Sequence, residues 1–224
     1  RSNIDVNLSR SFIKESSPYL AVKAHYEGEF PDDLVCLHNF EGGYCGLSKV
    51  ESDRINVCYI TDYKSFKRYK NIEDFQTEIV SKNKYLKEAF LNMKPVFDTP
   101  LTISQISFAT KDAVENHMIM CGDSASMIHP LAGNGMGMAI RSAYIASDLI
   151  SQYFKGEILS RADLEKRYTE NWKKEFQSRL KTGYIIARLF KIGFLTETLI
   201  SVIKLFPNIL PSIIKMTHGK PMKI

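Results

Sequence analysis

The residue types best suited to chemistry are concentrated in one short stretch of the sequence. An apolar segment, Met118–Cys121, runs directly into Gly122 and Asp123, and Pro130 follows after six intervening residues. A carboxylate at the end of a strand lies where open α/β sheets bind ligands, and it accepts hydrogen bonds well from sugar or ribityl hydroxyls. The pattern therefore predicts that Asp123 faces a small-molecule site.

Glycine occupies alternate positions just after this segment, at Gly133, Gly135 and Gly137. Since glycine has no Cβ, the backbone there can approach a ligand closely and expose its amides. A helix predicted from about Met136 to Phe154 would point the positive end of its dipole at the same ligand. A glycine-rich turn before an ordinary helix is the alternative, but it does not explain the proline and the strand-terminal acid at this spacing.

This ordered set resembles the second flavin-binding motif of class A flavoprotein monooxygenases, a motif that geranylgeranyl reductases and flavin halogenases share. The resemblance implies that the chain binds FAD, with Asp123 on the ribityl chain and the glycine loop against the pyrimidine end of the isoalloxazine ring. The residues that the resemblance assigns to the cofactor are Gly122, Asp123, Pro130, Gly133, Asn134, Gly135, Met136 and Gly137.

Two further segments bear on this resemblance. Residues Phe40–Lys49 are similar to the aromatic, glycine-rich strand of the reductase and halogenase branch, although Leu47 replaces the usual Trp and the following Pro is absent. The resemblance implies a strand across the substrate cavity, and a plain hairpin is the alternative. Arg1–Asp5 looks like the end of the segment that follows the first flavin-binding half. The GxGxxG unit of that half is not in the chain, so we expect about half of an FAD site.

Hydrophobic periodicity predicts an α+β fold. Together with the resemblance, this pattern implies an antiparallel substrate-domain sheet with helices (1–110), the returning C-terminal part of an FAD/NAD(P)-binding α/β domain (111–156) and a C-terminal helical layer (157–224). The predicted strands cover 19–26, 34–40, 44–50, 55–61, 101–108 and 117–121. Helical periodicity covers 63–94, and further helices cover 136–154 and a segment capped by Ser160. After Gly183 we expect two apolar helices, with breaks at Gly193, Pro207 and Pro211.

The chain's positive charge is concentrated at its C-terminal end. Hydrophobic residues make up 44% and charged residues 25% of the sequence, as in ordinary globular proteins, and no apolar run is long enough to predict a transmembrane helix. Residues 179–224 carry eight Lys or Arg and one acid, so their formal charge is +7. This apolar, basic tail predicts a peripheral contact with a membrane through residues 183–216, whereas nucleic acid is not an expected partner. A solvated basic face on packed helices is the alternative.

Several other residues allow a functional and a structural interpretation. The four cysteines have no CxxC spacing, so we expect reduced thiols in a cytoplasmic protein and no metal site, although Cys36 and His38 share a strand face. Cys45 is either a redox thiol near the flavin or a core thiol. His129 is a candidate contact to flavin or substrate. Trp172 is expected to anchor its charged helix to the rest of the protein.

These observations predict an FAD-dependent oxidoreductase. The leading hypothesis is a geranylgeranyl-reductase-like enzyme that acts on a small apolar or lipid-like substrate, with NAD(P)H as candidate electron donor. The alternatives are an FAD-dependent monooxygenase of an aromatic or polyene substrate and a flavin-less binding module. The sequence identifies no catalytic residue, because it contains no Ser-His-Asp order and no paired carboxylates at catalytic spacing. We expect a cytoplasmic protein, peripheral on the inner face of a membrane.

Overall fold

The computed structural model describes residues 3–13, 18–69, 71–104, 106–109, 111–190 and 193–219; the side chains of residues 11 and 190–196 are outside this description. The chain divides into two compact units, and each is treated by itself. Residues 14–107 form the first, called here the sheet unit. Residues 1–13 and 108–224 form the second, called here the helical unit.

The sheet unit is built on four long antiparallel strands. They are β1 (Tyr19–Glu27), β2 (Val35–Phe40), β3 (Gly43–Val50) and β4 (Arg54–Asp62), in the order β2-β3-β4-β1. The predicted meander is confirmed for β2, β3 and β4, whose short connections make them antiparallel neighbours, whereas β1 pairs with β4 and not with β2. Two short strands, β5 (Lys94–Pro95) and β6 (Leu101–Ile103), both pair with β1.

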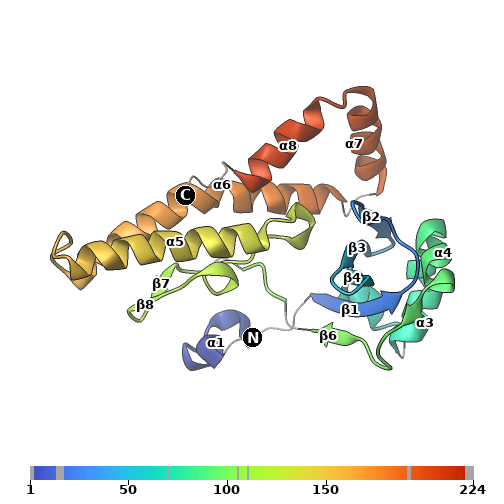
Figure 1. Ribbon diagram of the computed structural model, residues 1–224, viewed down its shortest axis with the longest axis horizontal. Helices are drawn as coiled ribbons and strands as arrows, with labels where there is room; N and C mark the ends of the chain where they lie inside the picture. Colours follow the sequence, from blue (N-terminus) through green and yellow to red (C-terminus); the bar gives the residue numbers. More distant parts are fainter. Residues whose placement is uncertain are drawn as a thin grey trace. The chain divides into compact units, whose positions relative to one another are not determined.

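Short helices follow the strands of the sheet unit, and α3 and α4 lie together beside the sheet (Figure 1). Asn71 and Asn83 begin α3 and α4 by accepting hydrogen bonds from backbone amides, so the predicted helical stretch 63–94 is divided by its own caps. The core between these layers includes Leu20, Val22, Cys45, Leu47, Ile55, Val57, Tyr59, Phe75, Val80 and Leu86. The helices are α2 (Tyr63–Phe66), α3 (Ile72–Glu78), η2 (Val80–Lys82, a 3-10 turn) and α4 (Lys84–Asn92).

The predicted strand over 101–108 is wrong beyond Ile103. In the antiparallel register Ile103 pairs with Ala21, so each later residue would pair with an earlier residue of β1. Since β1 begins at Tyr19, no partner remains after position 105. The alternating pattern in this stretch therefore does not correspond to strand pairing along its whole length.

The helical unit is dominated by two long helices that lie side by side, α5 and α6 (Figure 1). Their shared core contains Met138, Ala146, Leu149, Leu164, Tyr168, Trp172 and Phe176. Trp172 is buried there, as predicted, and its ring contacts that of Phe176. The elements are α1 (Asn3–Asn7), η1 (Ser11–Ile13), β7 (Val114–Glu115), β8 (Met118–Ile119), η3 (Gly122–Ser124), η4 (Pro130–Ala132), α5 (Gly135–Phe154), α6 (Arg161–Phe190), α7 (Gly193–Leu205) and α8 (Ile209–His218).

The C-terminal helices differ in two respects from the prediction. Helix α6 continues through Gly183, because this glycine is buried and leaves room for close packing: a Cβ there would lie 3.2 Å from Ile128 Cγ1. Pro211 does not break a helix either. It lies in the first turn of α8, where a missing amide proton loses no intrahelical hydrogen bond. Pro207 does lie between α7 and α8, as expected.

The predicted strand 117–121 is short. Only Met118–Ile119 is paired as a strand, antiparallel to β7. Asn116 and His117 form the turn with positive φ angles of 46° and 60°. The described residues contain no parallel sheet. We inferred that Asp123 lies at the edge of an α/β sheet, but the strand that precedes it in the described residues belongs only to this hairpin.

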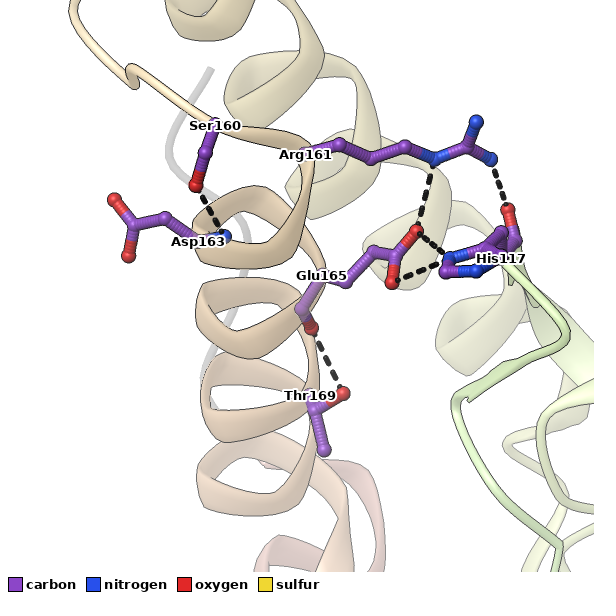
Figure 2. Close-up of polar contacts among 6 residues, drawn as sticks. All are labelled: His117, Ser160, Arg161, Asp163, Glu165 and Thr169. Carbon is purple, nitrogen blue, oxygen red and sulfur yellow. Dashed lines mark hydrogen bonds and ion pairs between the residues drawn. The ribbon is translucent and has the colours of Figure 1, made fainter.

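Polar contacts join the β7–β8 hairpin to the start of α6 (Figure 2). Glu165 binds the imidazole Nδ1 of His117 at 3.0 Å and accepts a hydrogen bond from Arg161 at 2.9 Å. Arg161 also donates to the carbonyl of His117 at 2.6 Å. Ser160 caps the helix through the amide of Asp163, as predicted.

The beginning of the chain lies with the helical unit, which differs from the predicted segment 1–110. The reason is the buried guanidinium of Arg10. It donates to Asp5 at 2.9 Å, to Glu115 of β7 at 2.8 Å and to the carbonyl oxygen of Ser124 at 2.7 Å. Glu115 and Ser124 lie more than a hundred residues from Arg10 in the sequence, so the periodicity of the first segment does not predict these two contacts.

Candidate functional site

The turn that follows β8 holds Gly122 tightly against α5. Gly122 has φ +59°, its amide donates to Ser142 Oγ at 3.0 Å, and a Cβ would lie 3.0 Å from Ala139 Cβ. The small side chains of Ala139 and Ser142 on α5 thus allow Gly122 to lie close to this helix. Asp123 follows on the surface, and within the described part of the chain its carboxylate takes no hydrogen bond or ion pair.

Two cationic side chains donate hydrogen bonds to main-chain carbonyl groups of this turn. Arg10 donates to the carbonyl of Ser124, and Lys111 Nζ donates to the carbonyl of Asp123 at 2.8 Å. Burial lowers the pKa of Lys111 below its ordinary value. Because these side chains bind main-chain oxygens, the Asp123 carboxylate stays available to an external partner.

His129 and Pro130 begin the short turn η4. The His129 ring is buried, stacks on Phe108 at 4.8 Å between centroids and accepts the amide of Leu131 at Nδ1. It therefore packs within the helical unit, which does not favour the predicted contact to flavin or substrate. Pro130 is exposed, and Gly133 ends the turn in the left-handed region at φ +64°.

The N-terminus of α5 is open. Asn134 stands at the cap position, yet its side chain makes no cap hydrogen bond, so it satisfies none of the first amides of the helix. Among the described residues, nothing beyond the two chain neighbours and the backbone of α5 itself lies within 4 Å of the position that a Cβ on Gly135 would occupy, and Met136 is 83% exposed. The described residues therefore leave open space beside the first turn of this 20-residue helix, where the positive end of its dipole lies.

The Asn134 side chain is buried and binds elsewhere in the chain. Its Nδ2 donates to the carbonyl oxygens of Thr217 at 2.9 Å and His218 at 3.4 Å, at the end of α8. Its Oδ1 fills the place of a Cβ on Gly137, which leaves no room for one. The resemblance assigned Asn134 to the cofactor; sequence reasoning had no signal for a partner 83 residues away.

These groups can bind an extended polar molecule without supplying acid or base. A carboxylate at Asp123 accepts from hydroxyls, and unpaired amides at the start of α5 donate to carbonyl or anionic oxygens. Asp123, Pro130, Gly133, Met136 and Gly137 are all exposed. The described residues contain no group of three or more His, Cys, Asp or Glu that could hold a metal ion.

The cysteine hypotheses concern the sheet unit. All four cysteines are free thiols. Burial raises the pKa of Cys45, which is fully enclosed in the core, so the reactive thiolate is disfavoured and a core role is favoured. Cys36 is half-buried beside His38, whose ring stacks on Tyr85 at 5.5 Å between centroids.

The sequence is similar to known proteins over the part of the chain that carries this site. The family model of squalene epoxidase matches residues 83–187, which include the whole candidate site. An uncharacterised protein of Methanocaldococcus jannaschii is 32% identical over 202 residues, covering 89% of this chain and 48% of that protein. The chain thus spans about half the length of this relative.

Solved structures give the fold. A flavin-dependent brominase superposes with a TM-score of 0.68 at 18% identity, covering 89% of this chain and 50% of that one. The HpxO protein of Klebsiella pneumoniae, solved with FAD and uric acid, has a TM-score of 0.67 at 14% identity, with 89% and 52% covered. The chain has the mixed α+β fold of the C-terminal part of FAD-binding oxidoreductases, as the sequence predicted.

Proposed function

We propose that this chain supplies the ribityl- and pyrimidine-binding half of the FAD site of an FAD-dependent oxidoreductase. The observation that carries the proposal is the uncapped N-terminus of α5, with free space at Gly135 and the unpaired carboxylate of Asp123 preceding it in the chain. Both features are those that a flavin requires at these two points, and the likeness to FAD-binding folds supports them.

Each group has a defined part in this proposal. Asp123 would accept hydrogen bonds from the ribityl hydroxyls, and the amides of Gly135, Met136 and Gly137 would donate to the pyrimidine edge. Pro130 would restrict the approach to the ring. Bound FAD would supply the electron-transfer chemistry, while the chain orients it, keeps water away and provides the field of the helix dipole.

The reaction class is part of the proposal. The match to the squalene epoxidase model supports an apolar, polyene-like substrate and oxygen insertion. A geranylgeranyl-reductase-like reduction rests on the Phe40–Lys49 strand, and a flavin-less binding module is the third alternative.

The complete polypeptide should be purified and its bound flavin measured by absorption. Turnover of a polyene with and without oxygen then separates the two enzymes, and a protein that takes up no FAD contradicts both.

A second proposal concerns the C-terminal helices and a membrane surface. In residues 183–216, the side chains with exposed apolar surface include Leu205 (74%) and Phe206 (60%). Others in the same helices are Tyr184, Ile185, Ile200, Val202, Ile209, Leu210, Ile214 and Met216. Phe190, Ile192, Phe194 and Leu195, which the prediction included, lie outside the described side chains. This many exposed apolar side chains in one segment favours a role as an interaction surface.

The charges of the same segment support an anionic membrane as that partner. Arg188, Lys204 and Lys215 are exposed, and Glu197 is an exposed acid. Each basic residue near an anionic surface contributes about 1 kcal/mol. Among the described residues no single helix is long and apolar enough to span a bilayer; the pair 197–205 and 209–218, bent by 118°, meets that test only jointly. We propose shallow, reversible insertion.

Cosedimentation with anionic liposomes tests the membrane proposal. We expect binding at low salt that weakens at high salt, because part of the attraction is electrostatic. Leu205→Glu with Phe206→Glu should abolish it. Leu159→Glu is the control, since Leu159 is even more exposed, at 90%, but lies between α5 and α6. Absence of binding at low salt, or equal loss in the control, would overturn the proposal.

A further inference from the structure

The end of α8 is joined to the glycine loop by a buried contact. Asn134 is 7% exposed and gives its amide to the carbonyls of Thr217 and His218, while Thr217 itself is 4% exposed. Asparagine is among the best helix N-cap residues, but here it leaves α5 uncapped. The side chain therefore ties the loop to α8 and leaves the amides of α5 to another acceptor.

A second contact lies at the residue before Asn134. His218 Nδ1 lies 3.1 Å from the carbonyl of Ile214 and 3.0 Å from Thr217 Oγ1, so the imidazole is held by its own helix. Its Nε2 lies 4.0 Å from the position of a Cβ on Gly133. The last turn of α8 is thus next to the start of the loop Gly133–Gly137.

The residue that follows α8 is packed closely against α6. Gly219 lies so close to the guanidinium of Arg179 that a Cβ would not fit. Arg179 is ion-paired with Glu175 in α6, and Glu175 lies 3.8 Å from Arg141 of α5. The three helices α5, α6 and α8 therefore meet through one set of charged and backbone groups.

We propose that the last turn of α8 supports the flavin site without touching the flavin, and that Asn134 is a positioning residue that keeps the glycine loop in its binding conformation. This inference rests on the proposed flavin site. A loop with three glycines loses much conformational freedom when it becomes ordered. An anchor that orders it beforehand strengthens ligand binding, and by linkage the ligand must then also stabilise the anchor.

Hydrogen exchange of the complete polypeptide tests this linkage. Adding FAD should slow amide exchange in residues 133–138 and also in residues 214–219, although the latter touch the flavin only through the loop. In Asn134→Ala, saturating FAD should still protect 133–138 but no longer 214–219. Met216 lies in the same turn and its side chain is 58% exposed, so Met216→Ala serves as control and should behave like the wild type.

Isosteric substitution separates the hydrogen bond from the shape of the side chain. Asn134→Ala should weaken FAD binding roughly three- to tenfold, the size of one net hydrogen bond. Asn134→Asp should be weaker still, because it places a carboxylate against two carbonyl oxygens. Wild-type affinity in both variants, or FAD that protects 133–138 and leaves 214–219 unchanged in the wild type, would overturn the inference. Failure of FAD to protect 133–138 would instead contradict the proposed flavin site.

Discussion

Gly135 and Gly137 are two residues apart, yet they are glycine for different reasons. At Gly137 the protein itself excludes a side chain, because Asn134 Oδ1 occupies the position of the Cβ. At Gly135 nothing in the described structure lies within 4 Å of that position. A side chain at Gly137 should therefore disturb the protein, and one at Gly135 should disturb only a ligand.

The effect of a side chain at Gly137 on protein stability can be measured without flavin. We expect Gly137→Ala to lower the stability of the ligand-free protein by about 1–3 kcal/mol, as overpacking does. Gly135→Ala is the matched control and should leave the melting temperature unchanged or slightly raised, since alanine favours helix. Equal melting temperatures for the two variants would show that Asn134 moves aside freely.

The role of Asp123 is tested by its affinity for the ribityl chain. Asp123→Ala should weaken FAD binding by about 1.5–3 kcal/mol, because it removes a hydrogen bond to a charged group. Asp123→Asn keeps one acceptor oxygen without the charge and should fall between wild type and alanine. FAD titration of the three proteins gives the order, and an alanine variant with undiminished affinity would refute the assignment.

At this scale the sequence predicted the turn and the glycine loop better than the contacts that hold them, and its assignment of these residues to a cofactor stays a prediction. The order Gly122, Asp123, Pro130 and the three glycines follows from local spacing. The partners of Asn134 and Arg10 could not be predicted, because they come from segments far away in the chain and depend on packing.

Among the elements, the β7–β8 hairpin and α6 are joined through Glu165. Partial burial raises the pKa of this carboxyl, but the hydrogen bonds from His117 and Arg161 lower it by more, so the pKa lies below its ordinary value of 4.5. A carboxylate with a depressed pKa contributes stability above its unfolded pKa, and that contribution is lost as the pH falls through the folded pKa.

The pH dependence of Glu165→Gln follows from this sign. Near neutral pH the variant should melt at a lower temperature than the wild type. The difference should shrink as the pH is lowered below about 4.5, where the wild-type carboxyl also becomes neutral. Thermal melts between pH 3 and 7 measure it, with the nearby surface variant Asp163→Asn as comparison. A difference that is constant across this range would contradict the account.

Elements with strong periodicity were predicted well, and those that depend on neighbours were not. Strands β1 to β4 and helix α5 follow from alternation and helical spacing within each segment. The strand at 101–108 was predicted too long because its length is set by where β1 begins. Gly183 was interpreted as a helix end, although it is there for contact with Ile128.

For the whole molecule, the chain accounts for one half of the proposed cofactor site and for a surface of its own. The sheet unit has a hydrophobic core of its own. The helical unit contains the glycine loop, the contact of Asn134 with α8 and the exposed apolar side chains of the C-terminal helices. Helix α8 belongs to two of these features, because its exposed side chains and its last turn lie in one ten-residue element. We therefore expect liposome binding and FAD binding to influence one another in the complete polypeptide.

The central claim is that the open N-terminus of α5 receives the flavin, and Gly135→Val tests it most directly. Since no atom of the described structure lies near this position, the ligand-free variant should melt at the wild-type temperature. FAD titration of the complete polypeptide should nevertheless show binding weakened roughly tenfold or more, because the new side chain would overlap the ring. Undiminished FAD affinity in a variant that folds normally would contradict the account.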